Sequence, residues 1–309
     1  MINFSDVFET LESESVIEQR RLVIKSCLNV YYGLTLEQHY RISFVSTIPP
    51  IEFESTKEIK ITQGKETDGV YWTCFDLLKK EAKDVFFIFC DSLIETIENI
   101  FDEYEAINNI KDRYHSWKVL LKNKNKMTYE NYQGLFGELY FMADILAKQI
   151  GLENALKCWV GPDGYSKDFS TSDTWYELKT IGTSSSTIKI NSLTQLESDV
   201  DGHLITIIVE KMSEQFDEGF CSVSKLYKYI FEQLPNRFLK ELFVNKVLKY
   251  GYIDNDETIN KYKFEIKNIN KYLVNDKFPK LSRKEIKNMA IAQVKYELFL
   301  SSLEDYMEY

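Results

Sequence analysis

The sequence predicts a mixed α/β chain of the α+β class, whose central part runs helix, strand, strand, strand, helix, strand. Residues 128–151 carry an apolar stripe at helical spacing, formed by Tyr132, Leu135, Leu139, Met142, Leu146 and Ile150. Two short extended segments, KDFS and WYELKTIG, are joined by a Ser/Thr/Asp turn, which is typical of a hairpin. The apolar run LITIIVEK has the composition of a buried strand.

The part before residue 106 predicts a small α+β domain, residues 1–105. The patterns indicate a helix over 15–31, strands over 40–45, 58–62, 70–75 and 84–89, and an amphipathic helix over 91–104. An Asn- and Lys-rich linker over 122–126 then leads to Thr128, a residue type that favours a helix N-cap. We expect the central helix to begin there.

The central part, residues 106–221, continues with the helix that ends at Gly151 and with the hairpin. A third strand is expected over 187–191, a short helix over 192–200, and the buried strand over 204–211. Residues 222–309 predict a mostly helical region. Its expected elements are helices over 223–234 and 237–250, a strand region over 262–273, and a final helix over 282–303.

Composition narrows the function classes. The five cysteines are scattered and the three histidines lie far apart, without a CxxC or HxxH pair. This pattern argues against a zinc site and against a Cys/His nucleophile, and it favours reduced thiols in a cytoplasmic protein. No apolar run approaches the length of a membrane span, and the acidic N-terminus lacks the pattern of a signal peptide. We therefore expect no membrane partner.

The charge is unevenly distributed. The chain has a net charge of −10, yet residues 222–296 contain 16 Lys or Arg and 8 Asp or Glu, a local balance of +8. The remaining residues therefore carry −18. A basic region on an acidic body predicts a polyanion contact at that end. The alternative is that these Lys-rich helices are only solvated surface.

The chemistry is expected around Asp168, Glu177 and Lys179. Residues two apart in a strand share a face, so Glu177 and Lys179 point the same way, and the hairpin returns Asp168 beside Glu177. Oxygen ligands suit Mg²⁺ or Mn²⁺, and the carbonyl of Leu178 is a further ligand. Lys179 would position the attacking water and stabilise charge. We expect these residues in a near-surface cleft; the alternative is an exposed strand face with a salt bridge.

Two flanking helices add candidates. Glu138 lies on the apolar face of the central helix, where a carboxylate is costly unless it is paired or bound to a metal. It is a candidate metal-site residue; the alternatives are that it caps a strand or pairs with Lys179. Gly134 and Gly137 make sense if another backbone packs closely. Gln195, on the expected short helix, could contact phosphate or a metal-bound water, or be an ordinary exposed residue.

These residues resemble a known family. The shared features are Trp117, the GLFGEL run at 134–139, Trp159-Val-Gly161-Pro162, Lys167-Asp168-Phe169, the ELK strand at 177–179, and Gln195-Leu196. With the order of elements, they resemble the PD-(D/E)XK phosphodiesterase superfamily and, more narrowly, a bacterial family encoded near phage-defence and restriction-modification genes. The resemblance is clear over residues 115–200, and Lys167 stands where the superfamily name has proline. It implies a restriction-endonuclease-like core with a Mg²⁺-dependent nuclease fold.

The leading hypothesis is a Mg²⁺-dependent DNA endonuclease, a subunit of a bacterial anti-phage or restriction system. Asp168, Glu177 and the Leu178 carbonyl hold the metal, Lys179 orients water, Glu138 supports the metal shell and Gln195 assists. The alternatives are a non-catalytic DNA-binding or assembly subunit that retains the fold, and an RNA-directed nuclease. No base-reading motif appears, so we expect a protein partner, docked by the N-terminal domain, to select the target. Homo-oligomer formation stays open.

Overall fold

The computed structural model describes residues 19–122, 127–252, 262–288 and 290–308, with Phe4, Val7, Phe8, Thr10 and Leu11. The chain forms two compact units, Met1–Lys124 and Asn125–Tyr309. Their boundary differs from both predicted boundaries, at 105/106 and 221/222. The residues after 222 belong to the same unit as the central part, so the second unit is the one that carries the predicted site.

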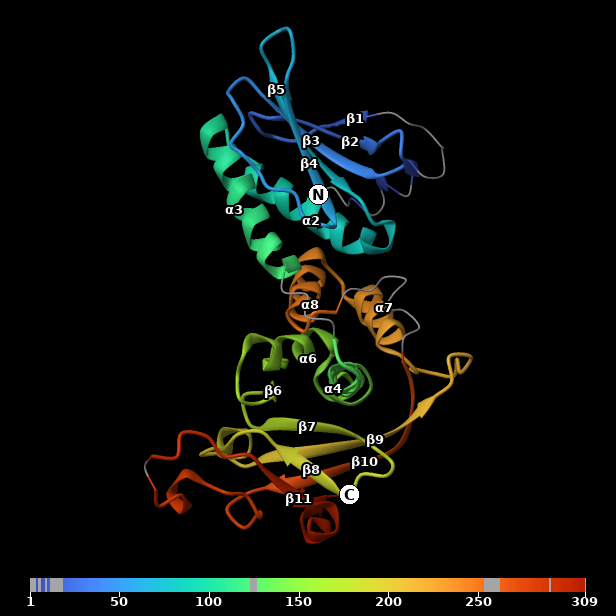
Figure 1. The fold of residues 1–309 in the computed structure, drawn as a ribbon, viewed down its shortest axis with the longest axis vertical. Coiled ribbons are helices and arrows are strands. Elements are labelled where there is room, and N and C mark those ends of the chain that lie inside the picture. The colour runs from blue at the N-terminus through green and yellow to red at the C-terminus, as the bar shows by residue number, and fades with distance from the viewer. Residues whose placement is uncertain are drawn as a thin grey trace. The chain divides into compact units, whose positions relative to one another are not determined.

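The first unit is a five-stranded antiparallel sheet covered on one face by helices (Figure 1). Its sheet order is β1-β2-β3-β5-β4. The strands are β1 (Gln19–Leu22), β2 (Asn29–Leu34), β3 (Tyr40–Ser46), β4 (Ile59–Lys65) and β5 (Tyr71–Leu77); the helices are α2 (Lys83–Ile97) and α3 (Glu103–Lys122). Alternate residues of the strands face the helices, and Phe75 of β5 packs edge-on against Phe89 of α2.

The expected strands over 40–45, 58–62 and 70–75 are confirmed by β3, β4 and β5. The helix expected over 15–31 is wrong for residues 19–31, which contain β1 and the first half of β2, while 15–18 lie outside the described residues. The strand expected over 84–89 is also wrong, because these residues lie in α2. A short apolar run such as VFFIF fits a buried strand and a buried helix equally well. The helix expected over 91–104 ends at Ile97, and α3 begins at Glu103.

The second unit opens with the central helix. Thr128 caps α4 (Tyr129–Tyr140) through a hydrogen bond from the Asn131 N–H group, as expected. The helix continues through a π-helical turn, η2 (Phe141–Leu146), and α5 (Ala147–Ile150) to Gly151, where α6 (Leu152–Cys158) begins. The positive φ of Gly151, 81°, is a conformation that favours glycine and allows the chain to turn there.

A second five-stranded sheet lies under this helical layer, with the order β12-β10-β9-β7-β6 (Figure 1). The site is carried at one end of this sheet, which is formed by the edge strand β6 (Phe169–Ser170), then β7 (Trp175–Gly182) and β9 (Gly202–Met212); β6 is antiparallel and β9 parallel to β7. The expected third strand exists as β8 (Thr187–Ile190), but it pairs with β11 (Tyr296–Phe299) in a separate two-stranded sheet. The helix expected over 192–200 is only a 3-10 turn, η4 (Leu193–Gln195).

The region after residue 222 is less helical than expected. The helices α7 (Val223–Gln233) and α8 (Arg237–Lys249) are confirmed, and the expected strand region is β10 (Lys263–Val274), which pairs with β9. The final helix expected over 282–303 is wrong. This stretch contains the 3-10 turns η5 (Arg283–Glu285) and η6 (Leu300–Ser302) around β11, and β12 (Met307–Glu308) follows. The pairing of β11 with β8, far away in the sequence, overrides the local helical pattern.

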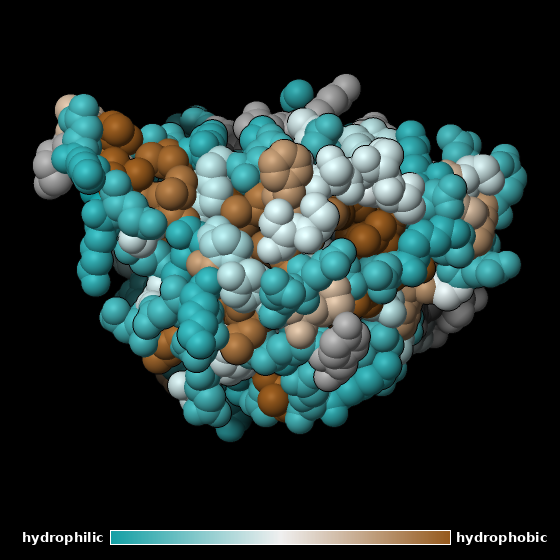
Figure 2. Space-filling model, turned by 90° about the horizontal axis from the view of Figure 1, so that it is seen from below, coloured by the Kyte–Doolittle hydropathy of each residue, from teal (hydrophilic) through white to brown (hydrophobic). Residues whose placement is uncertain are grey.

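Seen from below the view of Figure 1, the surface is mostly hydrophilic, with smaller hydrophobic areas between the polar groups (Figure 2). None of the helices in the described ranges combines the length and apolar composition that a membrane span requires.

Candidate active site

The central helix crosses β7 at a point of close contact. A Cβ atom added at Gly137 would lie 1.8 Å from Oγ1 of Thr180, whereas one added at Gly134 would have no atom within 4 Å. A close neighbour is therefore found at Gly137 and not at Gly134, and at Gly137 it is the side chain of Thr180 rather than the expected backbone. Because glycine has no side chain, α4 can pack closely against β7 at position 137. This places the next residue, Glu138, near the carboxylates of the hairpin.

Asp168 is held by main-chain hydrogen bonds on both sides. Its N–H group donates to the carbonyl of Tyr176 on β7, at 3.2 Å, and its own carbonyl accepts from the N–H groups of Val160 and Gly161 at 2.9 and 3.0 Å. Its carboxylate oxygen Oδ2 accepts from the N–H group of Leu178 at 2.7 Å. The hairpin thus places Asp168 at the edge of β7 beside Glu177, as the spacing predicts.

Glu177 is the most deeply buried member of the site, with 1% of its surface exposed. Its Oε1 atom accepts a hydrogen bond from Nζ of Lys179 at 2.7 Å, while Oε2 is buried without a hydrogen-bond partner. Burial, and next the charge of Asp168, raise the pKa of Glu177 to about 8. The expected near-surface cleft is therefore wrong for this residue, because the hairpin and the sheet enclose its carboxylate.

Lys179 and Gln195 meet in the same place. Oε1 of Gln195 lies 3.3 Å from Nζ of Lys179 and accepts from the N–H group of Asn191 at 2.7 Å. The side-chain oxygen of Gln195 thus helps to fix the ammonium group, and η4 brings it there although the expected helix is only one turn. Lys179 has 13% of its side chain exposed, so it lies between the buried carboxylates and solvent.

Glu138 lies nearby in a different environment. Its Oε2 atom accepts from Nε1 of Trp159 at 2.6 Å, and the hydroxyl group of Tyr250 lies 2.6 Å from both of its carboxylate oxygens. Burial, and next the charge of Asp168, raise the pKa of Glu138 well above its usual value. Of the alternatives for Glu138, the pairing with Lys179 is not seen, because Lys179 pairs with Glu177.

Two supporting residues carry no local signal in the sequence. Tyr250 follows α8, and its ring stacks on Trp159 at an interplanar angle of 11°. Lys246 of the same helix donates to the carbonyl of Trp159 and, at 2.7 Å, to Asp163. The helix from the basic region thus completes the surroundings of Glu138. Neither contact is visible in the sequence, because each joins residues more than 80 positions apart.

Lys167, at the position of the proline in the superfamily name, has a supporting role of its own. Its Nζ atom donates to the carbonyls of Thr194, Gln195 and Glu197 at 2.7, 2.7 and 3.1 Å. The same atom lies 3.8 Å from the ring centroid of Trp175. Burial is the main cause that lowers the pKa of Lys167 to about 8. Lys167 thereby ties the η4 turn, and with it Gln195, to the segment that carries Asp168 and leads into β6.

The residues present fit a hard divalent cation in part. A buried carboxylate oxygen without a donor is costly, and a cation beside Oε2 of Glu177 would account for it. The Leu178 carbonyl lies on the same edge of β7 as the N–H group that Asp168 binds, because both groups of one strand residue point to one side. However, the described residues contain no group of three Asp, Glu, His or Cys side chains arranged to hold a metal ion. Both oxygens of Glu138 already face protein donors.

Two carboxylates, one main-chain carbonyl and one ammonium group therefore meet at the edge of β7. Such a set binds hard cations and places a positive charge beside the position of a bound anion.

Comparison with known proteins gives one family. The model of a family described as "Putative PD-(D/E)XK family member, (DUF4420)" matches residues 4–301. No curated protein and no solved structure matches the chain.

Proposed function

The chain belongs to the DUF4420 family of PD-(D/E)XK proteins, and from this membership we propose that its second unit is a metal-dependent DNA endonuclease. The observation that supports this most strongly is the buried pair of Asp168 and Glu177, with a carboxylate oxygen of Glu177 that lacks a donor. A fold that only needed packing there would be more stable with apolar residues, because each buried carboxylate must be desolvated.

Each residue has a proposed role. Asp168, Glu177 and the carbonyl of Leu178 would hold Mg²⁺ or Mn²⁺, which, when bound, polarises the phosphate and lowers the pKa of a bound water. Lys179, fixed by Glu177 and by Gln195, orients the attacking water and offsets the negative charge that grows on the phosphate. The amide group of Gln195 assists at the phosphate.

Glu138 acts from one step further away. Because Trp159 and Tyr250 donate to its oxygens, we place it as a residue that supports the metal shell without being a metal ligand. Trp159 and Tyr250 keep this carboxylate fixed, and Lys246 in turn fixes the main chain at Trp159. Glu138, Trp159, Tyr250 and Lys246 thus form a hydrogen-bonded group beside the site, and we do not propose them as metal ligands.

A second candidate is a non-catalytic DNA-binding or assembly subunit that retains the fold. The occupied oxygens of Glu138 favour it, whereas the complete set of Asp168, Glu177 and Lys179 favours the enzyme. Incubation of the purified chain with plasmid DNA separates the two. The enzyme nicks or linearises the plasmid in Mg²⁺ and not in EDTA, whereas the non-catalytic subunit binds it and leaves it intact. An RNA substrate in parallel tests the RNA-directed alternative.

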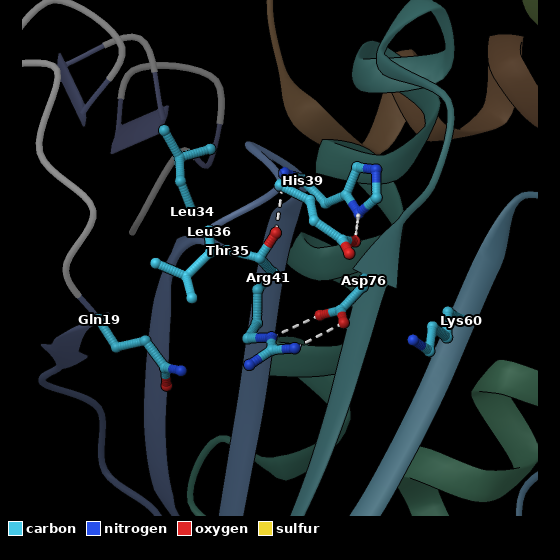
Figure 3. Close-up of a pocket in the computed structure, with 9 residues that line it drawn as sticks. Gln19, Leu34, Thr35, Leu36, His39, Arg41, Lys60 and Asp76 are labelled. Carbon is cyan, nitrogen blue, oxygen red and sulfur yellow. Dashed lines mark hydrogen bonds and ion pairs between the residues drawn. The ribbon is translucent and has the colours of Figure 1, made fainter.

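The first unit is proposed to dock a protein partner in an anti-phage or restriction system. Its sheet carries a pocket of about 480 Å³ in which Arg41 and Asp76 form a bidentate ion pair, with both N–O distances 2.6 Å (Figure 3). His39 pairs with Glu37 at the rim. Because Asp76 and Glu37 balance the positive charges of Arg41 and Lys60 among its lining residues, this pocket offers little attraction for a polyanion. Cleavage mapping on a phage genome with the chain alone tests the proposal: weak or unselective cuts support it, and efficient cuts at one short sequence contradict it.

A further inference from the structure

The chain between β10 and β11 carries an unusual concentration of positive charge (Figure 1, orange-red). Residues 277–295, called the basic strap below, contain six Lys or Arg and one Glu, in a chain whose net charge is −10. The cations are Lys277, Lys280, Arg283, Lys284, Lys287 and Lys295. Lys277, Lys284, Lys287 and Lys295 are exposed, and the other two are half-buried.

The strap differs from the rest of the basic region in how its charges are used. Between residues 222 and 274, six lysines form ion pairs with carboxylates: Lys225 and Lys263 share Asp217, Lys246 and Lys249 share Asp163, Lys267 pairs with Glu210 and Glu265, and Lys271 pairs with Glu308. The six cations of the strap form no ion pair with a carboxylate of any described residue. The strap thus holds six cations against one carboxylate, and these charges remain available to a polyanion.

The strap lies against the turn that carries Gln195. The N–H group of Arg283 lies 3.3 Å from a carboxylate oxygen of Glu197, and Nε2 of Gln293 lies 3.4 Å from the carbonyl of Asn191. The carbonyl of Glu197 in turn accepts from Lys167, the neighbour of Asp168 in the sequence. A short chain of contacts thus connects the strap with the carboxylate site.

The strap also has internal structure. The guanidinium group of Arg283 donates to the carbonyl of Ile291 at 2.8 Å, and Ser282 and Glu285 form a capping box around η5. The N–H group of Leu281 donates to the hydroxyl group of Tyr296 at the start of β11. These bonds hold the backbone that carries the exposed lysines, so less backbone freedom is lost when the strap binds a partner.

We infer that the basic strap is the surface that binds the sugar–phosphate backbone of DNA beside the carboxylate site. This inference rests on the proposed function. The remaining surface is acidic overall and repels DNA, so a local cluster of unpaired cations next to the site sets where the duplex lies. The paired lysines of α7, α8 and β10 add little, since their carboxylate partners compete with phosphate.

The test compares two triple variants of the full chain. The first, Lys277→Gln/Lys284→Gln/Lys287→Gln, removes three exposed strap cations. The second, Lys225→Gln/Lys267→Gln/Lys271→Gln, removes three ion-paired lysines with the same change in formal charge. Circular dichroism first establishes that both fold. Fluorescence anisotropy then gives the affinity for a duplex of random sequence, in EDTA, over a series of salt concentrations. Point variants are used because removal of all residues after 222 would also remove β10, which pairs with β9 in the sheet.

Counterion release predicts a slope of about 0.9 in log K against log salt for each phosphate contact. The magnitude of this slope is therefore expected to be smaller than that of the wild type by about two to three for the strap variant. For the control variant the decrease should be less than about one. Equal slopes for the two variants, with plasmid cleavage by the wild type intact, overturn the inference and leave the proposed function standing. Wild-type protein that neither binds nor cleaves DNA overturns both.

Discussion

The hydroxyl group of Tyr250 lies 2.6 Å from each carboxylate oxygen of Glu138, although 112 residues separate the two in the sequence. Glu138 comes from the helix that crosses β7, and Tyr250 follows a helix of the basic region. The contact places a hydroxyl donor against the buried carboxylate of Glu138. The charge of nearby Asp168 helps to raise the pKa of this carboxylate. The basic region is therefore a structural part of the site as well as a source of positive charge.

Replacement of Tyr250 tests how much its hydroxyl group contributes to the stability of the fold. Tyr250→Phe keeps the ring stacked on Trp159 and removes one hydrogen bond to a buried carboxylate, which costs about 1–3 kcal/mol in the free energy of unfolding. Urea denaturation measures this loss. Tyr229→Phe is the matched control, because Tyr229 is 38% exposed and its hydroxyl group makes no hydrogen bond to a described residue. A midpoint for Tyr250→Phe as high as that of the control would show that the contact contributes nothing.

The close approach of α4 and β7 can be tested with two glycines of one helix. Gly137→Ala drives a methyl group into Thr180 and is expected to lower the free energy of unfolding by about 1–3 kcal/mol. Gly134→Ala meets open space and is expected to raise it by about 0.5–1 kcal/mol through helix propensity. Thermal and urea denaturation report both changes. Equal effects at the two positions would contradict the packing described at Gly137.

The buried carboxyl group of Glu177 predicts how stability depends on pH in the absence of metal. Its pKa is raised from 4.5 to about 8 in the folded state, so between these values the folded protein binds more protons than the unfolded chain. The free energy of unfolding should therefore fall as the pH rises through this window. Glu177→Gln removes the titrating group and should flatten the profile. Urea denaturation in EDTA at a series of pH values checks this, and parallel profiles for the two proteins would refute it.

Metal binding should reverse that trend. A divalent cation binds the ionised carboxylates, so Mg²⁺, Mn²⁺ or Ca²⁺ should raise the melting temperature, and more strongly at pH 8 than at pH 6. Ca²⁺ should stabilise the protein and permit DNA binding with little cleavage. Asp168→Asn should lose the metal-dependent shift, while Asp173→Asn, in the exposed turn of the same hairpin, should retain it. A shift that survives in Asp168→Asn places the cation elsewhere.

The parts of the site that could be predicted from the sequence are local. A hairpin with a polar turn and a period of two residues is enough to bring Asp168 beside Glu177, and Lys179 follows on the same face. Gln195 was predicted on a helix that is only a 3-10 turn, yet its side chain reaches Lys179 because the three carbonyls bound by Lys167 hold the turn. The expected element is therefore wrong, and the contact of Gln195 with phosphate or a metal-bound water stays a prediction.

The parts that could not be predicted depend on distant contacts. Tyr250 reaches Glu138, and β11 pairs with β8, through packing that no local pattern contains. The exposure of Glu177 was predicted wrongly for the same reason, since the sheet and helices that enclose it come from separate stretches of the chain. The apolar run within Lys83–Ile97 predicts a strand as readily as a helix, because composition alone does not separate a buried strand from a buried helix.

Cleavage of plasmid DNA by matched preparations of the wild type and of Asp168→Ala tests the central claim most directly. In Mg²⁺ the wild type should nick or linearise the plasmid, and Asp168→Ala, Glu177→Ala and Lys179→Ala should each lose at least about 100-fold in rate while remaining folded. The double variant Asp168→Ala/Glu177→Ala should be little worse than either single variant, because the groups act as one unit. Near-wild-type cleavage by Asp168→Ala would contradict the assignment of this carboxylate site as the centre of a nuclease.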